Sequence, residues 1–190
     1  MKDYLSQFTL LTSNQNKIEE FKRFGLNDLK ISKGPDLKEV DSDPITVITY
    51  KSKDSGPFTI VEDTSLHITG EDVGVNVKWM INNIGDYFGK EAYWEVLLGV
   101  NDGEKVEVYG SRIYGKIVKD SSNKENVFGF DAFFEVKSAK KTLYQLDKEG
   151  LKDKYSARKD AVIEFIKHGN FMKSIEIKEI PKWGGEYQNV

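Results

Sequence analysis

Two adjacent carboxylates, Glu62 and Asp63, follow a short apolar run and are the most distinctive chemical feature of the sequence. The run Phe58-Thr-Ile-Val61 predicts a buried strand, so the pair is expected at the carboxyl end of that strand. Burying two neighbouring carboxylates is costly unless a cation lies beside them, and Mg²⁺ prefers carboxylate oxygens. The pattern therefore fits a magnesium site, with a solvated turn as the ordinary alternative.

A second polar cluster lies near the amino terminus, where Thr12, Ser13, Asn14 and Lys17 occupy the turn between an expected strand and an expected helix. Such a turn presents hydroxyls, free backbone N–H groups and an ammonium group, which together suit a phosphate. The turn contains no glycine, so it is not a Walker A loop. By itself it is more typical of a capped helix with a surface lysine.

Two further cations are placed on expected helices. Lys51 lies about two turns into a helix that starts at Asp43-Pro44, and Arg158 lies in the first turn of the last helix. Lys51 can reach inward from the flank of its helix, and Arg158 adds charge to a helix N-terminus that already attracts anions. Solvent-facing positions are the alternative for both side chains.

An aromatic cluster surrounds a glycine and an acid at Phe128, Gly129, Phe130 and Asp131. Aromatic rings can stack on a nucleobase, and a carboxylate can accept hydrogen bonds from base N–H groups. The alternative is that these phenylalanines belong to the hydrophobic core.

Alternating strands and helices must position these groups. Strands are predicted at residues 8–13, 58–61 and 65–68, in two short pieces within 105–118 that break at Gly110 and Gly115, and at 171–180. Helices are predicted at residues 18–24, 43–55, 77–84, 93–100 and 156–169, with a polar loop at 121–126 and a tail at 181–190. The interleaving indicates a single α/β domain over residues 1–190.

Composition excludes several classes of function. Hydrophobic residues make up 38% of the chain, enough for a packed core, and the net charge of −3 argues against a protein that coats nucleic acid. There is no cysteine, and the only histidines are His67 and His168, so thiolate and multi-histidine metal sites are excluded. The sequence shows no signal peptide and no apolar run near the ~18 residues that cross a membrane. A cytoplasmic protein with no membrane partner is expected.

Taken in order, these segments resemble the non-canonical purine nucleoside triphosphate pyrophosphatases, the family of inosine triphosphate pyrophosphatase. The matching segments are Thr12-Ser-Asn-Gln-Asn-Lys17, Glu39 with Lys51 twelve residues later, Glu62-Asp63-Thr64, Val77-Lys-Trp79, Phe128-Gly-Phe-Asp131, and Lys152 with Ser156-Ala-Arg158. The resemblance covers about residues 8–168. Its joint pattern is far more specific than any single segment.

Several positions depart from the family pattern. Ser13 replaces a glycine, Ala132 replaces a proline, and Ala157 replaces the histidine of a Ser-His-Arg motif. Residues 71–74 stand where a Pro-Gly turn is usual. The predicted strand after residue 170 has no counterpart in the family pattern.

The resemblance implies an elongated mixed β-sheet with flanking helices and two lobes around a central nucleotide-binding cleft. It implies Mg²⁺-dependent hydrolysis of nucleoside triphosphates such as ITP, dITP and XTP to the monophosphate and pyrophosphate, by a homodimer without a nucleic-acid partner. The implied metal ligands are Glu39, Glu62 and Asp63. Asp63 would also orient or deprotonate the attacking water, and Lys51 would act with it in catalysis. The implied substrate-binding residues are Thr12, Ser13, Asn14, Lys17, Lys51, Thr64, Phe128, Gly129, Phe130, Asp131, Lys152, Ser156 and Arg158.

Two alternatives remain open from the sequence. A Maf-like nucleotide pyrophosphatase has a related fold, but such proteins usually carry an arginine pair early in the first helix, where this chain has Lys17-Ile18. A protein of another class could bind a nucleotide to sense or sequester it without cleavage. Loss of the histidine at position 157 predicts a weaker preference for inosine and xanthosine triphosphates.

Overall fold

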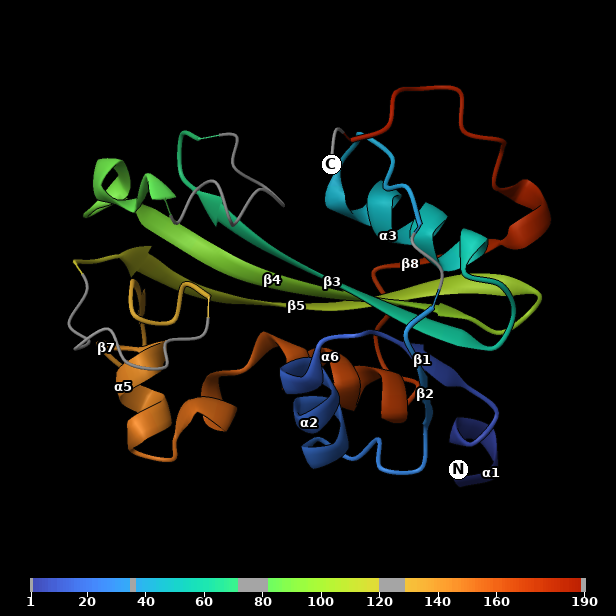
Figure 1. Cartoon of the computed structure of the whole chain (residues 1–190), viewed down its shortest axis with the longest axis horizontal. Helices are drawn as coiled ribbons and strands as arrows, with labels where there is room; N and C mark the ends of the chain where they lie inside the picture. Colours follow the sequence, from blue (N-terminus) through green and yellow to red (C-terminus); the bar gives the residue numbers. More distant parts are fainter. Residues whose placement is uncertain (1, 35–36, 72–81, 120–128, 189–190) are drawn as a thin grey trace. The chain divides into compact units, whose positions relative to one another are not determined.

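The computed structural model describes residues 2–34, 37–71, 82–119 and 129–188. These residues form an eight-stranded mixed sheet in the order β2-β1-β3-β4-β5-β6-β7, with β8 also paired to β5 (Figure 1). The chain divides into two compact units: unit 1 holds residues 1–63, 96–111 and 158–190, and unit 2 holds residues 64–95 and 112–157. The α/β class expected from the sequence is confirmed.

Unit 1 combines parallel strands with helices on both faces of the sheet. Its elements are α1 (Lys2–Leu5), β1 (Thr9–Leu11), α2 (Gln15–Arg23), β2 (Lys30–Ser32), α3 (Pro44–Asp54), most of α6 (Ala157–Ile166), β8 (Lys173–Glu176), the 3₁₀ turn η3 (Ile177–Glu179), and parts of β3 (Thr59–Ile68), β4 (Glu91–Asn101) and β5 (Lys105–Ile117). Figure 1 shows α3 on one face of the sheet and α2 with α6 on the other.

Helix α3 begins where the sequence predicts it, whereas α2 begins at Gln15, three residues before the predicted range 18–24. The side chain of Asn14 accepts the backbone N–H groups of Asn16 and Lys17 and so caps α2. Asp43 caps α3 in the same way, with Pro44 at the first helical position. Strand β2 was not predicted, because its residues are all exposed and lack apolar alternation.

Three secondary-structure predictions need correction. Residues 59–68 form one continuous strand, β3, so Glu62 and Asp63 lie in mid-strand rather than at a strand end. The helix predicted at 93–100 is strand β4, because a short apolar run fits either periodicity and this one is buried on both faces. Residues 105–117 form one strand, β5, instead of two pieces.

The glycines within these strands mark close contacts rather than breaks. A Cβ at Gly115 would lie 2.2 Å from the carbonyl oxygen of Glu135 on the neighbouring strand. A Cβ at Gly99 would lie 2.8 Å from the Cβ of Ser52 on α3. Glycine is therefore needed where another backbone or a helix packs directly on the strand.

Unit 2 contains several short elements that the sequence did not predict. They are η1 (Ile84–Tyr87), β6 (Phe134–Val136), β7 (Lys141–Thr142), α5 (Leu143–Lys148) and η2 (Lys152–Tyr155). Thr142 and Gln145 form a reciprocal capping box at the start of α5. Most of the helix predicted at 77–84 and the loop at 121–126 lie outside the described residues.

The C-terminal part of the chain differs in detail from the prediction. Helix α6 ends at Ile166, and only residues 173–176 of the strand predicted at 171–180 pair with β5. No helix among the described residues combines the length and apolar character needed to cross a membrane.

Candidate active site

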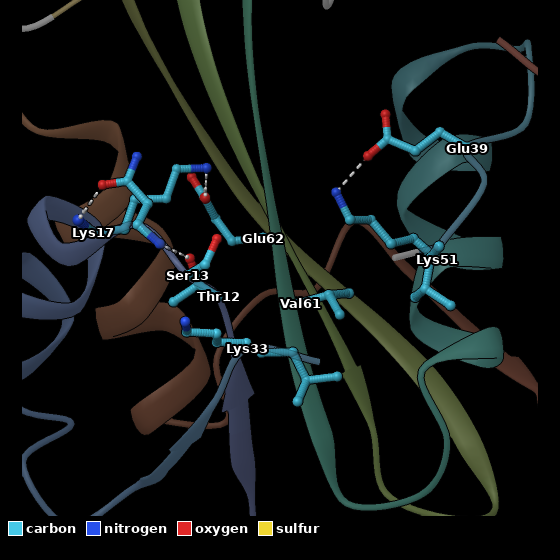
Figure 2. Close-up of a pocket in the computed structure, with 11 residues that line it drawn as sticks. Thr12, Ser13, Lys17, Lys33, Glu39, Lys51, Val61 and Glu62 are labelled. Carbon is cyan, nitrogen blue, oxygen red and sulfur yellow. Dashed lines mark hydrogen bonds and ion pairs between the residues drawn. The ribbon is translucent and has the colours of Figure 1, made fainter. Parts of the chain in front are cut away.

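A pocket of about 290 Å³ lies within unit 1, where β1 and β3 meet the turn before α2 and the flank of α3 (Figure 2). The lining residues are Leu11, Thr12, Ser13, Asn14, Lys17, Lys33, Leu37, Glu39, Lys51, Val61 and Glu62. The pocket thus contains the predicted phosphate turn and three of the predicted charged residues.

The turn between β1 and α2 is preorganised by its own side chains. Thr12 accepts the N–H of Asn14 at 3.2 Å through its hydroxyl, and its backbone N–H donates to the carbonyl of Ser32 at 2.9 Å. Asn14 caps α2, whose N-terminus carries partial positive charge. The turn therefore offers a fixed, positively polarised wall to an anion.

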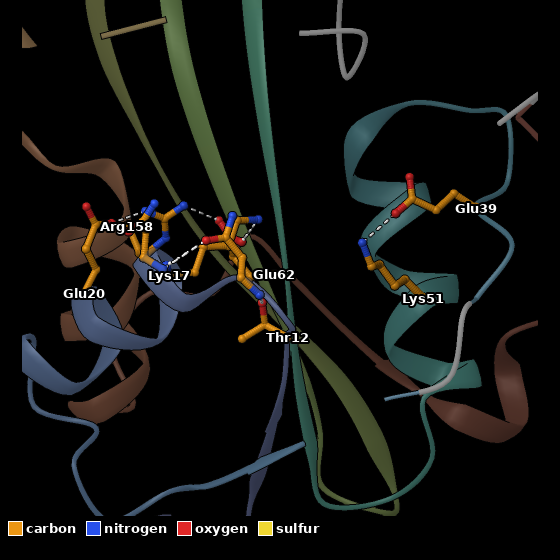
Figure 3. A network of polar contacts seen from close by, with 9 residues as sticks. Thr12, Lys17, Glu20, Glu39, Lys51, Glu62 and Arg158 are labelled. Atoms are coloured by element: carbon orange, nitrogen blue, oxygen red, sulfur yellow. Dashed lines mark hydrogen bonds and ion pairs between the residues drawn. The ribbon is translucent and has the colours of Figure 1, made fainter. Parts of the chain in front are cut away.

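Lys17 and Arg158 converge on the buried carboxylate of Glu62 (Figure 3). Lys17 pairs with Oε2, and Arg158 donates to Oε1 at 2.9 Å and also pairs with Glu20. Burial disfavours the charge of Arg158, but Glu62 and Glu20 outweigh that effect and raise the pKa of the guanidinium. This network holds together α2, β3 and α6.

A second charged group lies across β3, where Lys51 donates to Glu39 at 2.5 Å (Figure 2). Burial opposes the charge of Lys51, but Asp63 and Glu39 together raise its pKa. Burial also raises the pKa of Asp63, and the negative charges of Glu39 and Glu62 add to this, against the opposing effect of Lys51 and Lys17. Glu39, Lys51 and Asp63 are thus one electrostatic group.

Alternation along β3 explains why these two groups are separate. Successive side chains of a strand point to opposite faces of the sheet. In Figure 2 Val61 points toward Lys51, whereas Glu62 points toward Lys17. Asp63 shares the face of Val61, in agreement with its electrostatic coupling to Lys51.

Unit 1 thus brings together most of the residues implied for phosphate and metal. The set comprises Thr12, Ser13, Asn14, Lys17, Glu39, Lys51, Glu62, Asp63 and Arg158.

The residues implied for the base fall in unit 2, together with Thr64. Asp131 pairs with Lys152 at 2.5 Å. Phe130 is buried and packs edge-on against Trp94 and Phe134. Two further residues implied for the base are Gly129, whose φ is +54°, and Ser156, which is buried. Phe128 lies outside the described residues.

The sequence did not single out three residues that the structure adds to the site. Glu20 follows Lys17 by three positions on α2, a spacing that places both on one helix face and could have indicated it. Lys33 and Leu37 also line the pocket, and neither belongs to a helix or a strand, so no periodicity could have revealed them.

Comparison with known proteins assigns the class. The Ham1 family matches residues 8–168, so the chain belongs to the Ham1 family, in agreement with the family resemblance of its motifs. Ham1 family members are nucleoside triphosphate pyrophosphatases, and the chain is accordingly a hydrolase of that general kind.

A solved structure supports the fold. A HAM1 protein from Coxiella burnetii is similar with a TM-score of 0.67 and 19% sequence identity, over 85% of this chain and 96% of that chain. No curated protein matches the sequence.

Proposed function

We propose that the protein hydrolyses non-canonical purine nucleoside triphosphates, such as ITP, dITP and XTP, to the monophosphate and pyrophosphate with the help of Mg²⁺. The observation that carries the proposal is the pocket of unit 1, where a helix N-terminus and three lysines lie beside the carboxylates of Glu39 and Glu62. Cations on the transferring oxygens and a positioned water are what phosphoryl chemistry requires.

The donor chemistry of Glu39 and Asp63 fits Mg²⁺. The described residues contain no cluster of three or more His, Cys, Asp or Glu side chains that could hold a metal. Mg²⁺ does not need one, because it usually takes one or two carboxylates and completes its octahedron with water and substrate phosphates. Burial raises the pKa of Asp63, and the negative charges of Glu39 and Glu62 add to this effect; a cation beside the carboxylate would favour its ionised form.

Glu62 has a different part in this proposal. Lys17 and Arg158 occupy both of its oxygens, so we assign it to holding these cations in place. Glu39 and Asp63 are left as the proposed metal ligands. When bound, Mg²⁺ neutralises phosphate charge.

Residues of the chain would bind the phosphates, activate the water and recognise the base. The turn at Thr12, Ser13 and Asn14, together with Lys17 and Lys51, would bind the phosphates. Asp63 would orient or deprotonate the water that attacks the α-phosphorus, whose bond to the bridging oxygen of pyrophosphate then breaks. Recognition of the base is assigned to residues of unit 2, among them Thr64, Phe130, Asp131, Lys152 and Ser156.

Pyrophosphate release across a panel of nucleotides, with and without Mg²⁺, tests the proposal. Fast release from ITP, dITP or XTP with Mg²⁺ supports it. Fast pyrophosphate release only from nucleotides with other bases would favour a Maf-like specificity. Tight nucleotide binding without pyrophosphate release would favour a nucleotide sensor. Sedimentation of the same sample tests the proposed homodimer.

A further inference from the structure

The C-terminal segment of residues 180–188, here called the C-terminal strap, pairs with the chain just before α3. The backbone N–H of Gln188 donates to the carbonyl of Glu39 at 2.9 Å, and the N–H of Asp41 donates to the carbonyl of Glu186 at 3.0 Å. Between these bonds, Val40 and Tyr187 form an antiparallel bridge. The strap lies beyond residues 8–168, the part of the chain that the Ham1 family matches.

Side chains anchor the strap to α3 and to the core beneath it. Lys53 donates to the carbonyl of Ile180 at 2.9 Å, and the ring of Trp183 packs edge-on against Tyr50 with centroids 5.1 Å apart. Ile180 is buried in the same cluster as Val40. The strap is therefore fixed at one end to the helix that carries Lys51, and it pairs at the other end with Glu39.

The segment that carries Glu39 has no helix or strand of its own. Residues 37–39 are irregular, and within the described part of the chain Val40 enters regular pairing only through its bridge to Tyr187. The side-chain amide of Gln188 also donates a hydrogen bond to the carbonyl of Val40 at 3.0 Å. Among the described residues, the strap thus supplies the backbone pairing on both sides of Val40, next to the carboxylate that contacts Lys51.

We propose that the C-terminal strap is a positioning element that fixes the backbone of Glu39, so that its carboxylate faces Lys51 and a metal bound with the substrate's phosphates. This inference rests on the proposed function, because that function makes Glu39 a metal ligand. Substitution of the groups that orient a metal ligand typically lowers metal affinity by about 10- to 100-fold.

Truncation tests the proposal without relying on turnover. The variant lacking residues 184–190 keeps Ile180 and Trp183 but loses the pairing to Glu39, and the variant lacking only 189–190 is its matched control. Binding of Mn²⁺, a paramagnetic substitute for Mg²⁺, is measured by electron paramagnetic resonance with saturating α,β-methylene ITP, which is not cleaved. In the longer truncation Mn²⁺ binding should be about 10-fold weaker than in the wild type. In the control truncation Mn²⁺ binding should not change. Binding of the analogue in EDTA should stay within about twofold, because the phosphate turn is untouched.

A second variant covers the case in which the truncated protein fails to fold. Gln188→Pro removes the N–H that donates to Glu39 in the full-length chain, and Gln188→Ala keeps that N–H. Weaker Mn²⁺ binding in Gln188→Pro than in Gln188→Ala supports the proposal. Unchanged Mn²⁺ affinity in a folded truncation or in Gln188→Pro overturns the proposal. An equal loss of Mn²⁺ binding and of analogue binding in EDTA also overturns it.

Glu39→Gln separates this inference from the proposed function. If Glu39→Gln binds Mn²⁺ as tightly as the wild type, the metal role of Glu39 itself is wrong. If Glu39→Gln binds weakly while the strap variants bind normally, only the strap inference is wrong.

Discussion

One step along β3 gives Glu62 and Asp63 different chemical environments. Glu62 is neutralised by Lys17 and Arg158 on one face of the strand, whereas Asp63 shares the other face with Lys51 and feels the negative charge of Glu39. The sequence indicated a charged pair at one place. Side-chain alternation separates it into a carboxylate that pairs with Lys17 and Arg158 and one that we propose as a metal ligand.

Asp63→Asn should lower turnover by about 10²-fold or more, because the amide keeps the size but can neither hold a cation by charge nor accept a proton from water. The fold should persist, since the side chain is not part of the described core. Steady-state pyrophosphate release and circular dichroism measure the two effects. Asp54→Asn, an exposed change at the end of α3, is the control. Near wild-type turnover of Asp63→Asn would contradict the assignment.

Lys51→Ala should reduce kcat/KM by about 30- to 900-fold, the equivalent of about 2–4 kcal/mol for one electrostatic donor. The reason is that Lys51 lies in the pocket and is coupled to Glu39 and Asp63, whereas a solvated lysine would contribute little. Lys22→Ala, on the exposed side of α2, is the matched control. Equal kcat/KM for the two variants would show that Lys51 plays no part in phosphate binding or transfer.

At the scale of elements, the neighbouring strands β3, β4 and β5 carry a charged cluster in unit 2. Arg112 donates to Glu95 at 2.5 Å, and His67 lies 3.5 Å from the same carboxylate and 2.8 Å from the hydroxyl of Ser65. Burial would raise the pKa of Glu95, but the bonds from His67 and Arg112 outweigh it and lower the pKa below the ordinary value of 4.5. The ionised form of Glu95 is therefore favoured by folding.

The sign of the resulting pH dependence follows from linkage. Because the pKa of Glu95 is lower in the folded chain, the unfolded chain binds this proton first as the pH falls. The contribution to stability is present above about pH 4.5 and is lost as the pH falls toward the folded pKa. The Tm of the wild type should fall between about pH 5 and 3, and the Tm of Glu95→Gln should fall less over the same range. Glu91→Gln, exposed on the same strand, should keep that decrease, and identical curves for the wild type and Glu95→Gln would refute the account.

Elements with local signals could be predicted from the sequence, and elements defined by distant contacts could not. Asp43 indicated the start of α3 because a cap is a contact within one turn of chain, and the spacing of Ile18 and Phe21 indicated α2. Strand β4 was taken for a helix because its apolar run fits both periods, and its identity depends on β3 and β5 beside it. Gly115 was taken for a break because its close contact with Glu135 involves a strand twenty residues away.

The same limit applies to the candidate site. Lys17 and Lys51 were singled out from their places in a turn and on a helix, and Glu39 from the family resemblance of its spacing to Lys51. Glu20 and the strap were missed, since their importance comes from partners on other elements.

At the scale of the whole molecule, the residues implied for the reaction and for the base belong to different units. Unit 1 holds the phosphate turn, the three pocket lysines and the acidic residues, and unit 2 holds Asp131, Lys152 and Ser156. The junction between Ala157 and Arg158 joins the two units in sequence. Substitution at this junction is therefore a direct way to ask whether base preference and catalysis can change separately.

Base preference should be weaker in this chain than in members with Ser-His-Arg. The family resemblance implies that the histidine of Ser-His-Arg reads the 6-oxo group of hypoxanthine. Ala157 offers no such donor, and Arg158 already donates to Glu62 and pairs with Glu20. A site that loses one donor loses affinity for the oxo base and also its penalty against analogues that lack the oxygen. The kcat/KM ratios of ITP and dITP to GTP and ATP should accordingly be modest in the wild type.

Ala157→His should raise the ratio of ITP to ATP, because the imidazole restores a donor. Ala157 is fully buried, so any larger side chain also costs about 1–3 kcal/mol of stability through overpacking. Ala157→Leu, which adds volume without a donor, controls for that cost, and Tm measurements verify that both variants are folded at the assay temperature. A gain in the ratio of ITP to ATP in the histidine variant alone assigns base reading to this position. Strong inosine selectivity in the wild type with no gain in Ala157→His, or an equal gain in Ala157→Leu, would show that another group reads the base.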